Sequence, residues 1–231
     1  MVSGGGTGIG LACARALTGA GYAVTVLGRR EAPLVGAVES GAAEALIVAD
    51  ARTPPPLHGF SILVNAAGLA ESAPFGKTAV EMFQRHLDVN LIGAVALTHA
   101  VLPGMMAAGH GRIVHIASTA ALRGYAYTTA YTASKHALLG FVRALALEVA
   151  SKGITVNAVC PGFTETAIVA ESIARIAART GRSEAEARAE LVKGNPQGRL
   201  VQPEEVAEAA LYLCGAAAVN GVALPVAGGE V

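Results

Sequence analysis

The chain opens with MVSGGGTGIG, residues 1 to 10, and this glycine-rich start indicates the fold class that the rest of the sequence supports. An amphipathic run follows it to about Gly19, and Tyr22 to Leu27 (YAVTVL) is an apolar run typical of a buried strand. Glycines ahead of a helix let the backbone approach a pyrophosphate, and the helix N-terminus favours its negative charge. The spacing is Gly4-x-x-x-Gly8-x-Gly10 rather than the general dinucleotide pattern, so a merely flexible N-terminus remains the alternative.

Predicted strands and helices alternate along the rest of the chain. The further strands are Ala45–Ala49, Phe60–Val64, Arg112–Ala117, Ile154–Val159 and Gly221–Val226, and the helices are Thr78–Met106, an Ala-rich segment running to Ala150, and Pro203–Gly215. This alternation predicts an α/β fold, a Rossmann-like doubly wound parallel sheet with helices on both faces. Two features depart from it. Only about three residues precede the glycines, where a central strand is normally longer, and Thr53–Pro56 leaves little room for a crossover helix.

Composition narrows the class of protein. With 231 residues, 53% of them hydrophobic and 15% charged, the chain is long enough for one domain spanning 1–231. A net charge of zero without a basic cluster predicts no nucleic-acid partner. Three cysteines far apart indicate a reduced, cytoplasmic location without disulfides, and the histidines show no metal-ligand spacing, so no metal is expected.

Membrane insertion is not expected either. No signal peptide is recognisable, since Met1 leads straight into the glycines. Val89 to Gly109 is almost long enough to span a bilayer, but it contains Asn90, Thr98, His99 and Pro103. We therefore interpret this segment as a buried helix of a soluble protein.

Three side chains after the predicted strand Arg112–Ala117 form a candidate catalytic group. Ser118 stands where that strand ends, and Tyr131 and Lys135 are spaced i and i+4, so they share one face of the following helix. A hydroxyl, a phenol and an ammonium at the carboxyl end of a strand suit proton transfer to or from a carbonyl or alcohol oxygen. We expect Lys135 to lower the pKa of the Tyr131 phenol. A lone Tyr-x-x-x-Lys is weak evidence, because it occurs by chance in many helices.

Two further positions carry a polar signal. Gly28 stands after the second strand, where sites for NAD usually have an acid, and Arg29 follows it, as suits a 2′-phosphate. Two solvated arginines in a loop are the alternative. Asn90 is a poor residue for the middle of a helix, so a buried Asn90 should have a polar role, of which helix–helix hydrogen bonding is the simplest.

Together these motifs resemble the classical short-chain dehydrogenase/reductase (SDR) family over essentially the whole chain. Ser3-Gly4-x-x-x-Gly8-x-Gly10 is similar to its glycine motif with Ser3 for Thr, and Asn65-Ala66-Ala67-Gly68 to its N-N-A-G with Ala66 for Asn. Asn90, Ser118, Tyr131 and Lys135 match its catalytic tetrad. The resemblance implies cofactor contacts at Ser3, Gly4, Gly8, Ile9, Gly10, Arg29, Asp50, Ala51, Asn65, Ala66, Gly68, Tyr131, Lys135, Pro161, Gly162, Thr164 and Thr166.

The resemblance also implies an activity. A family member would transfer hydride between a nicotinamide and a carbonyl carbon, with Tyr131 as general acid or base, Ser118 polarising the carbonyl and Asn90 positioning a water beside Lys135. NADP(H) is preferred on the Arg29 argument, with NAD(H) possible, and a homotetramer or homodimer is expected. The alternatives are an NAD-dependent alcohol or 3-hydroxyacyl dehydrogenase working oxidatively, or a non-catalytic nicotinamide-binding protein.

The substrate is the least specified part of the prediction. GITVNAVCPGFTET and GRLVQPEEVAE resemble 3-oxoacyl-[acyl-carrier-protein] reductases and polyketide ketoreductases, which implies a 3-oxoacyl thioester or similar β-keto substrate under a helical insertion at about 164–200. Ala120 and Thr128 replace the His and Lys with which 3-hydroxybutyrate dehydrogenases hold a free carboxylate. Arg175, Arg179 and Arg182 could form a stripe for the phosphates of a carrier arm, or simply a solvated helix face.

Overall fold

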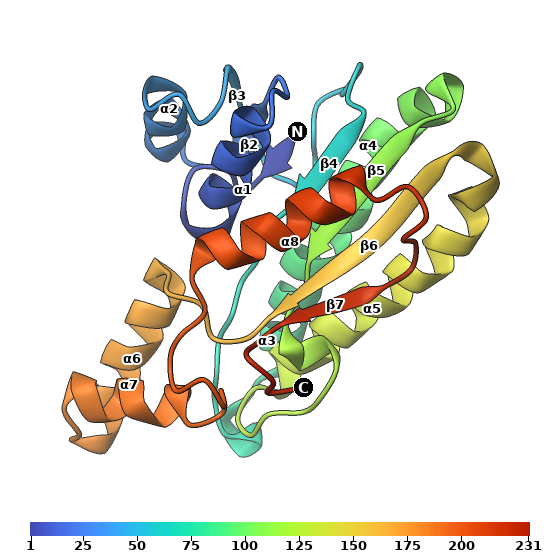
Figure 1. Ribbon diagram of the computed structural model, residues 1–231. Coiled ribbons are helices and arrows are strands. Elements are labelled where there is room, and N and C mark those ends of the chain that lie inside the picture. The colour runs from blue at the N-terminus through green and yellow to red at the C-terminus, as the bar shows by residue number, and fades with distance from the viewer.

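Seven parallel strands form one sheet in the computed structural model, which describes residues 1–231 (Figure 1). The sheet order is β3-β2-β1-β4-β5-β6-β7, which is the reversal at β1 and β4 of a doubly wound fold. The predicted fold class is therefore confirmed. The strands are β1 (Val2–Ser3), β2 (Thr25–Gly28), β3 (Ala45–Val48), β4 (Ile62–Asn65), β5 (Gly111–Ile116), β6 (Ile154–Pro161) and β7 (Ala223–Val226).

Helices cover both faces of the sheet, as Figure 1 shows. They are α1 (Gly8–Gly19), α2 (Glu31–Glu39), α3 (Val80–Leu87), α4 (Gly93–Ala108), α5 (Thr129–Val149), α6 (Ala167–Thr180), α7 (Glu184–Val192) and α8 (Pro203–Gly215). Successive strand residues alternate between two cores: Val26 and Val64 face α1 and α8, whereas Leu27 and Leu63 face α4 and α5. This alternation with period two lets a short apolar run supply both cores.

The missing crossover helix is confirmed. Between β3 and β4 the chain runs through an irregular segment with the three prolines, and no helix covers that side of β3. As a result β3 is only partly buried, and Val48 at its end is 49% exposed. Prolines explain this, because they remove backbone donors and fix φ, so the segment cannot build a regular element.

Several boundaries differ from the prediction by a few residues. β2 begins at Thr25 rather than Tyr22, because the Tyr22 N–H instead donates to the Leu17 carbonyl in the turn that ends α1. β4 includes Asn65, and β7 begins at Ala223 rather than Gly221. The first strand is as short as expected: Val2 and Ser3 alone pair with β2 and β4.

The predicted helix Thr78–Met106 is present as α3, a π-helical turn at Asp88–Ile92, and α4. Val80–Ala108 is long and apolar enough to cross a membrane by length and composition alone. Here it packs one face, including Leu97, Val101 and Met105, into the core against the sheet. That arrangement agrees with the buried helix we expected.

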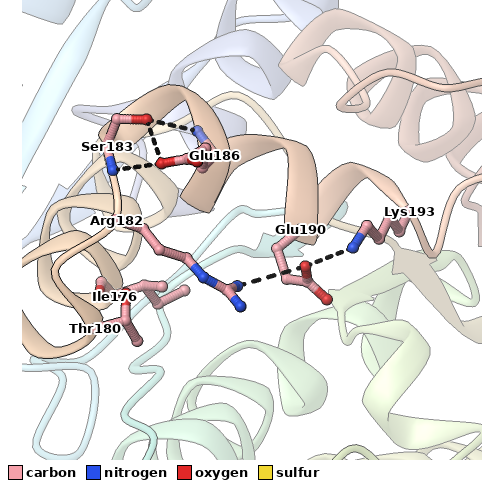
Figure 2. Close-up of polar contacts among 7 residues, drawn as sticks. All are labelled: Ile176, Thr180, Arg182, Ser183, Glu186, Glu190 and Lys193. Atoms are coloured by element: carbon pink, nitrogen blue, oxygen red, sulfur yellow. Dashed lines mark hydrogen bonds and ion pairs between the residues drawn. The ribbon is translucent and has the colours of Figure 1, made fainter.

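The segment 164–200 forms α6 and α7, which lie beside the carboxyl edge of the sheet, away from its centre (Figure 1, orange). Figure 2 shows the turn that joins these helices. Ser183 and Glu186 form a capping box there, in which each side chain accepts a hydrogen bond from the other residue's backbone N–H. The cap explains why the predicted helical insertion at about 164–200 consists of two helices.

Candidate active site

Ser118 and Tyr131 come from neighbouring elements at the carboxyl edge of the sheet. Ser118 follows β5 and caps a short 3₁₀ turn at Thr119–Ala121, where its Oγ accepts the Ala120 N–H at 3.1 Å. Tyr131 lies in the first turn of α5, and Lys135 lies one turn further on. The Ser118 side chain lies close enough to the Tyr131 phenol for hydrogen bonding between them to lower the pKa of Tyr131. The three side chains therefore meet as predicted.

Lys135 is buried beneath the phenol. Its side chain is 4% exposed, and Nζ donates to the Ile116 carbonyl at 3.0 Å, at the end of β5. Nζ lies 5.8 Å from the centre of the Tyr131 ring. Burial lowers the pKa of Lys135 from 10.5 to about 8, because the charged ammonium loses its hydration.

The pKa of Tyr131 moves in the opposite direction to our expectation. Burial of the phenol raises its pKa, and hydrogen bonding by Ser118 only partly offsets this. Lys135 is not among the groups that shift the pKa of Tyr131 here; its Nζ donates to the Ile116 carbonyl. Desolvation of the phenol is thus the dominant cause of the shift.

Asn90 is buried in the π-helical turn, a helix irregularity that is frequent at functional sites. Its Oδ1 accepts the Leu69 N–H at 2.8 Å, and its Nδ2 donates to the Leu69 carbonyl at 3.0 Å and to Ser134 Oγ at 2.9 Å. A Cβ on Gly68 would lie 3.4 Å from Asn90 Oδ1 and 3.8 Å from Lys135 Nζ. Asn90 therefore links the loop after β4 to α5 directly beside Lys135.

A cleft of about 420 Å³ lies over the carboxyl ends of β1, β2 and β4, and the sheet order reverses between β1 and β4. The glycine loop and the N-terminus of α1 form one wall. A Cβ on Gly10 would lie 2.2 Å from the Gly4 carbonyl oxygen, so only glycine permits this close turn. The helix N-terminus, with its unpaired N–H groups, faces the cleft, and the residues present fit the pyrophosphate of a dinucleotide.

The structure separates the predicted cofactor residues into two groups. Gly4, Gly8, Ile9, Gly10, Arg29, Asp50, Ala51, Ala66, Gly68 and Thr166 line the cleft. Ser3, Asn65, Tyr131, Lys135, Pro161, Gly162 and Thr164 do not line it. Thr164 instead turns its hydroxyl to the Gly162 carbonyl at 3.0 Å.

Ser3 and Asn65 support the cleft from below. Both are buried, the Ser3 hydroxyl donates to Asn65 Oδ1, and the Ala67 N–H donates to Ser3 Oγ at 3.3 Å. Asn65 Nδ2 also contacts His115 Nδ1 at 3.4 Å. These residues therefore hold the Ala66–Gly68 turn in place, which is a positioning role, and the direct cofactor contact that we expected of them stays a prediction.

The cationic end of the cleft is larger than the sequence indicated. Arg30 and Arg52 line it together with Arg29; Arg30 directly follows Arg29 in the sequence, whereas no motif indicated Arg52. Arg52 Nη2 pairs with the Asp50 carboxylate at 2.7 Å and lowers the pKa of Asp50 to about 2. Asp50 is thus an anion held by Arg52 at the rim of the cleft, where we predicted a cofactor contact. Thr7, in the glycine loop, also lines the cleft and was not among the predicted cofactor residues.

The expected arginine stripe is divided. Arg175 and Arg179 line a second cavity together with Lys77 and Glu71. Arg182 does not, because it follows the end of α6 and its Nη1 lies 3.6 Å from Glu190 of α7, as Figure 2 shows. A helix spacing of i and i+7 could not apply to Arg182, since Gly181 ends the helix with a positive φ of 70°.

Comparison with known proteins extends these findings. A family model described as enoyl-(acyl carrier protein) reductase matches residues 4–230. The "Putative ketoacyl reductase" of Streptomyces coelicolor is 39% identical over 99% of this chain and 95% of its own length, and the acetoacetyl-CoA reductase of Shinella zoogloeoides is 33% identical over 100% and 97%. A crystal structure of an actinorhodin polyketide ketoreductase with NADPH superposes with a TM-score of 0.92 at 39% identity, covering 99% of this chain and 95% of the other.

These matches span the chain from the glycine loop to its last strand, and they include the cleft and the Ser118–Tyr131–Lys135 group. They exclude the alternative of a non-catalytic binding protein. The chain belongs to the short-chain dehydrogenase/reductase family and is a nicotinamide-dependent oxidoreductase.

Proposed function

We propose that this enzyme reduces a 3-oxoacyl thioester or a similar β-keto substrate and that it prefers NADP(H). The observation that carries the proposal is the meeting of Ser118, Tyr131 and buried Lys135 at the carboxyl edge of the sheet, beside a cleft suited to a dinucleotide. The relatives named as ketoacyl, acetoacetyl-CoA and polyketide ketoreductases support this substrate class.

Each catalytic side chain has a role that follows from its environment. When bound, the nicotinamide supplies or accepts the hydride. Ser118 donates a hydrogen bond to the substrate oxygen, and Tyr131 transfers a proton to that oxygen or takes it away. Lys135 anchors the floor of the site through the Ile116 carbonyl, and Asn90 fixes the Leu69 loop beside it. A water held near Asn90 as a proton path stays a prediction.

The preference for NADP(H) rests on charge at the end of β2. Gly28 occupies the place of an acid, and Arg29 and Arg30 line the cleft next to it. A guanidinium binds a phosphate through charge-assisted hydrogen bonds, whereas a ribose hydroxyl gains little from it. The presence of NADPH in the ketoreductase structure agrees with this preference.

The second cavity is proposed to receive the phosphate-bearing arm of the thioester. Lys77 faces it from the loop before α3, and Arg175 and Arg179 face it from α6. Glu71, the acid in its lining, is paired with Arg85 at 3.0 Å. The three remaining cations therefore make this cavity favourable for an anion.

Substrate kinetics test the proposal. Acetoacetyl-CoA reduction should saturate, and charge reversal at Arg175 and Arg179 should raise KM for the CoA ester more than KM for a small ketone. Arg182→Glu is the matched control, because Arg182 lies on the same segment but pairs with Glu190 outside the cavity. Rates should be measured in both directions with both cofactors. A preference for simple secondary alcohols and NAD⁺, with no turnover of β-keto thioesters, would contradict the proposal.

We also propose a homo-oligomer, a tetramer or a dimer, located in the cytoplasm. Large apolar side chains are exposed on α3, on the π-helical turn, and on α4 and α5: Val80 (79%), Ile92, Met106 and Leu147 (83%). Apolar surface of this kind usually marks an interface between subunits. All three cysteines are free and buried, as suits a reducing compartment.

A further inference from the structure

Glu230, the last residue but one of the sequence, lies where three segments around the catalytic group meet. Its Oε1 accepts a hydrogen bond from the Tyr125 hydroxyl at 2.5 Å, and its backbone carbonyl accepts one from Arg123 at 3.3 Å. Its carboxylate also lies against Gly162 and Gly194, where an added Cβ would be 3.0 and 3.2 Å from it. Residues far apart in sequence thus converge on one side chain.

Tyr125 extends this contact to the residue next to Ser118. Its oxygen is 2.6 Å from Thr119 Oγ1. A phenol has one hydrogen, and the carboxylate is the stronger acceptor, so Tyr125 donates to Glu230 and accepts from Thr119. The direction of each effect on the pKa of Tyr125 agrees: burial and Glu230 raise it, to about 12, and Thr119 lowers it. The hydrogen-bond chain Thr119–Tyr125–Glu230 therefore has one consistent direction.

This chain fixes the loop between the two proposed catalytic residues, Ser118 and Tyr131. Thr119 is buried, and its carbonyl accepts the N–H groups of Leu122 and Arg123. The Tyr125 ring packs edge-on against Phe163, with 6.4 Å between ring centres, and Phe163 lies on the segment after β6. The loop that joins Ser118 to Tyr131 is therefore tied to the segment after β6 and, through Tyr125, to Glu230.

We infer that Glu230 and Tyr125 are positioning residues that determine specificity, because they hold the 119–127 loop against the segment after β6 for substrates that extend beyond the reacting carbonyl. The inference rests on the proposed function, since it takes Ser118 and Tyr131 as the catalytic pair. When the Thr119–Tyr125–Glu230 hydrogen-bond chain is broken, only a fraction of molecules hold the loop in the competent position, and the apparent affinity for substrate falls by that fraction.

The test compares acetoacetyl-CoA with a small β-keto ester. Tyr125→Phe and Glu230→Ala should each raise KM for acetoacetyl-CoA about threefold to tenfold, with a smaller change for the ester and an unchanged Kd for NADPH. Because the two residues act as one unit, the double variant should be no worse than either single variant. Glu230→Gln keeps an acceptor for Tyr125 and should restore most of the affinity that Glu230→Ala loses.

Tyr127→Phe is the matched control. Tyr127 lies on the same loop and is 64% exposed, and its hydroxyl makes no hydrogen bond, so its loss should leave KM unchanged. Multiplicative effects in the double variant, an equal effect of Tyr127→Phe, or equal changes for both substrates would overturn the inference. Failure of the proposed function is distinguishable, since it would appear as a wild-type enzyme that does not turn over acetoacetyl-CoA at all.

Discussion

Replacing Asn90 by Ala separates its structural role from its catalytic one. The substitution leaves the Leu69 N–H and carbonyl without their partner, whereas Ser134 Oγ keeps its bond to the Tyr131 carbonyl at 2.7 Å. An unpaired buried polar group costs about 1–3 kcal/mol, and Leu69 is only partly buried, so each group falls at the low end of that range. We expect the free energy of unfolding to fall by about 2–3 kcal/mol.

Asn157→Ala provides the matched control for this experiment. Asn157 is buried in β6 and also holds two backbone groups, the Val219 carbonyl at 2.8 Å and the Val222 N–H at 3.1 Å, but it lies away from the catalytic group. Urea unfolding should show similar losses of stability for both variants. Below their unfolding transitions, only Asn90→Ala should lower kcat, by about tenfold or more. Equal kcat for the two variants, or a stability loss below about 0.5 kcal/mol for Asn90→Ala, would refute this reasoning.

Three further predictions follow from the site. The Tyr131→Phe variant should bind NADPH normally in a fluorescence titration, and its kcat should fall by a factor on the order of 10² or more. Normal turnover would remove Tyr131 from the mechanism. Arg29→Ala should lower kcat/KM for NADPH about tenfold or more and leave that for NADH nearly unchanged, and a wild type that prefers NADH would contradict the charge argument. Leu147→Glu should reduce the molar mass in light scattering to a smaller species, because it places a charge on the exposed face of α5; a monomeric wild type at micromolar concentration would exclude the oligomer.

The sequence was sufficient for the fold because its signals are local. Alternating strands and helices, the glycine loop and the prolines at Thr53–Pro56 each act within a few residues, and their alternation indicates a doubly wound parallel sheet. Tyr131 and Lys135 could be paired for the same reason, since i and i+4 on one helix are neighbours. The predicted ends of strands were less accurate. β2 does not begin at Tyr22, because the Tyr22 N–H donates within the turn that ends α1.

The parts that sequence could not supply depend on contacts between distant segments. Ser3 and Asn65 belong to the predicted motifs, yet only their shared burial shows that they support the cleft instead of lining it. Arg52 lies in an irregular loop without a motif, and its place at the rim is visible only through its pair with Asp50. We expected Arg182 on the same helix face as Arg175 and Arg179, but the helix ends at Gly181, before Arg182.

The same burial that reverses the expected shift of Tyr131 bears on the direction of the reaction. Burial raises the pKa of Tyr131 above its ordinary value of 10.0 and lowers the pKa of Lys135 to about 8, so at neutral pH the phenol keeps its proton firmly. Reduction needs that protonated phenol as an acid, whereas oxidation needs the phenolate as a base.

Below the raised pKa of Tyr131 the rate of reduction should therefore not decline through loss of this proton, while the rate of oxidation should rise with pH toward alkaline values. Initial rates in both directions between pH 6 and pH 10, with the Tyr131→Phe background subtracted, measure this. An oxidation rate that is already constant at neutral pH would mean that the phenolate is populated there, and that burial does not control this tyrosine.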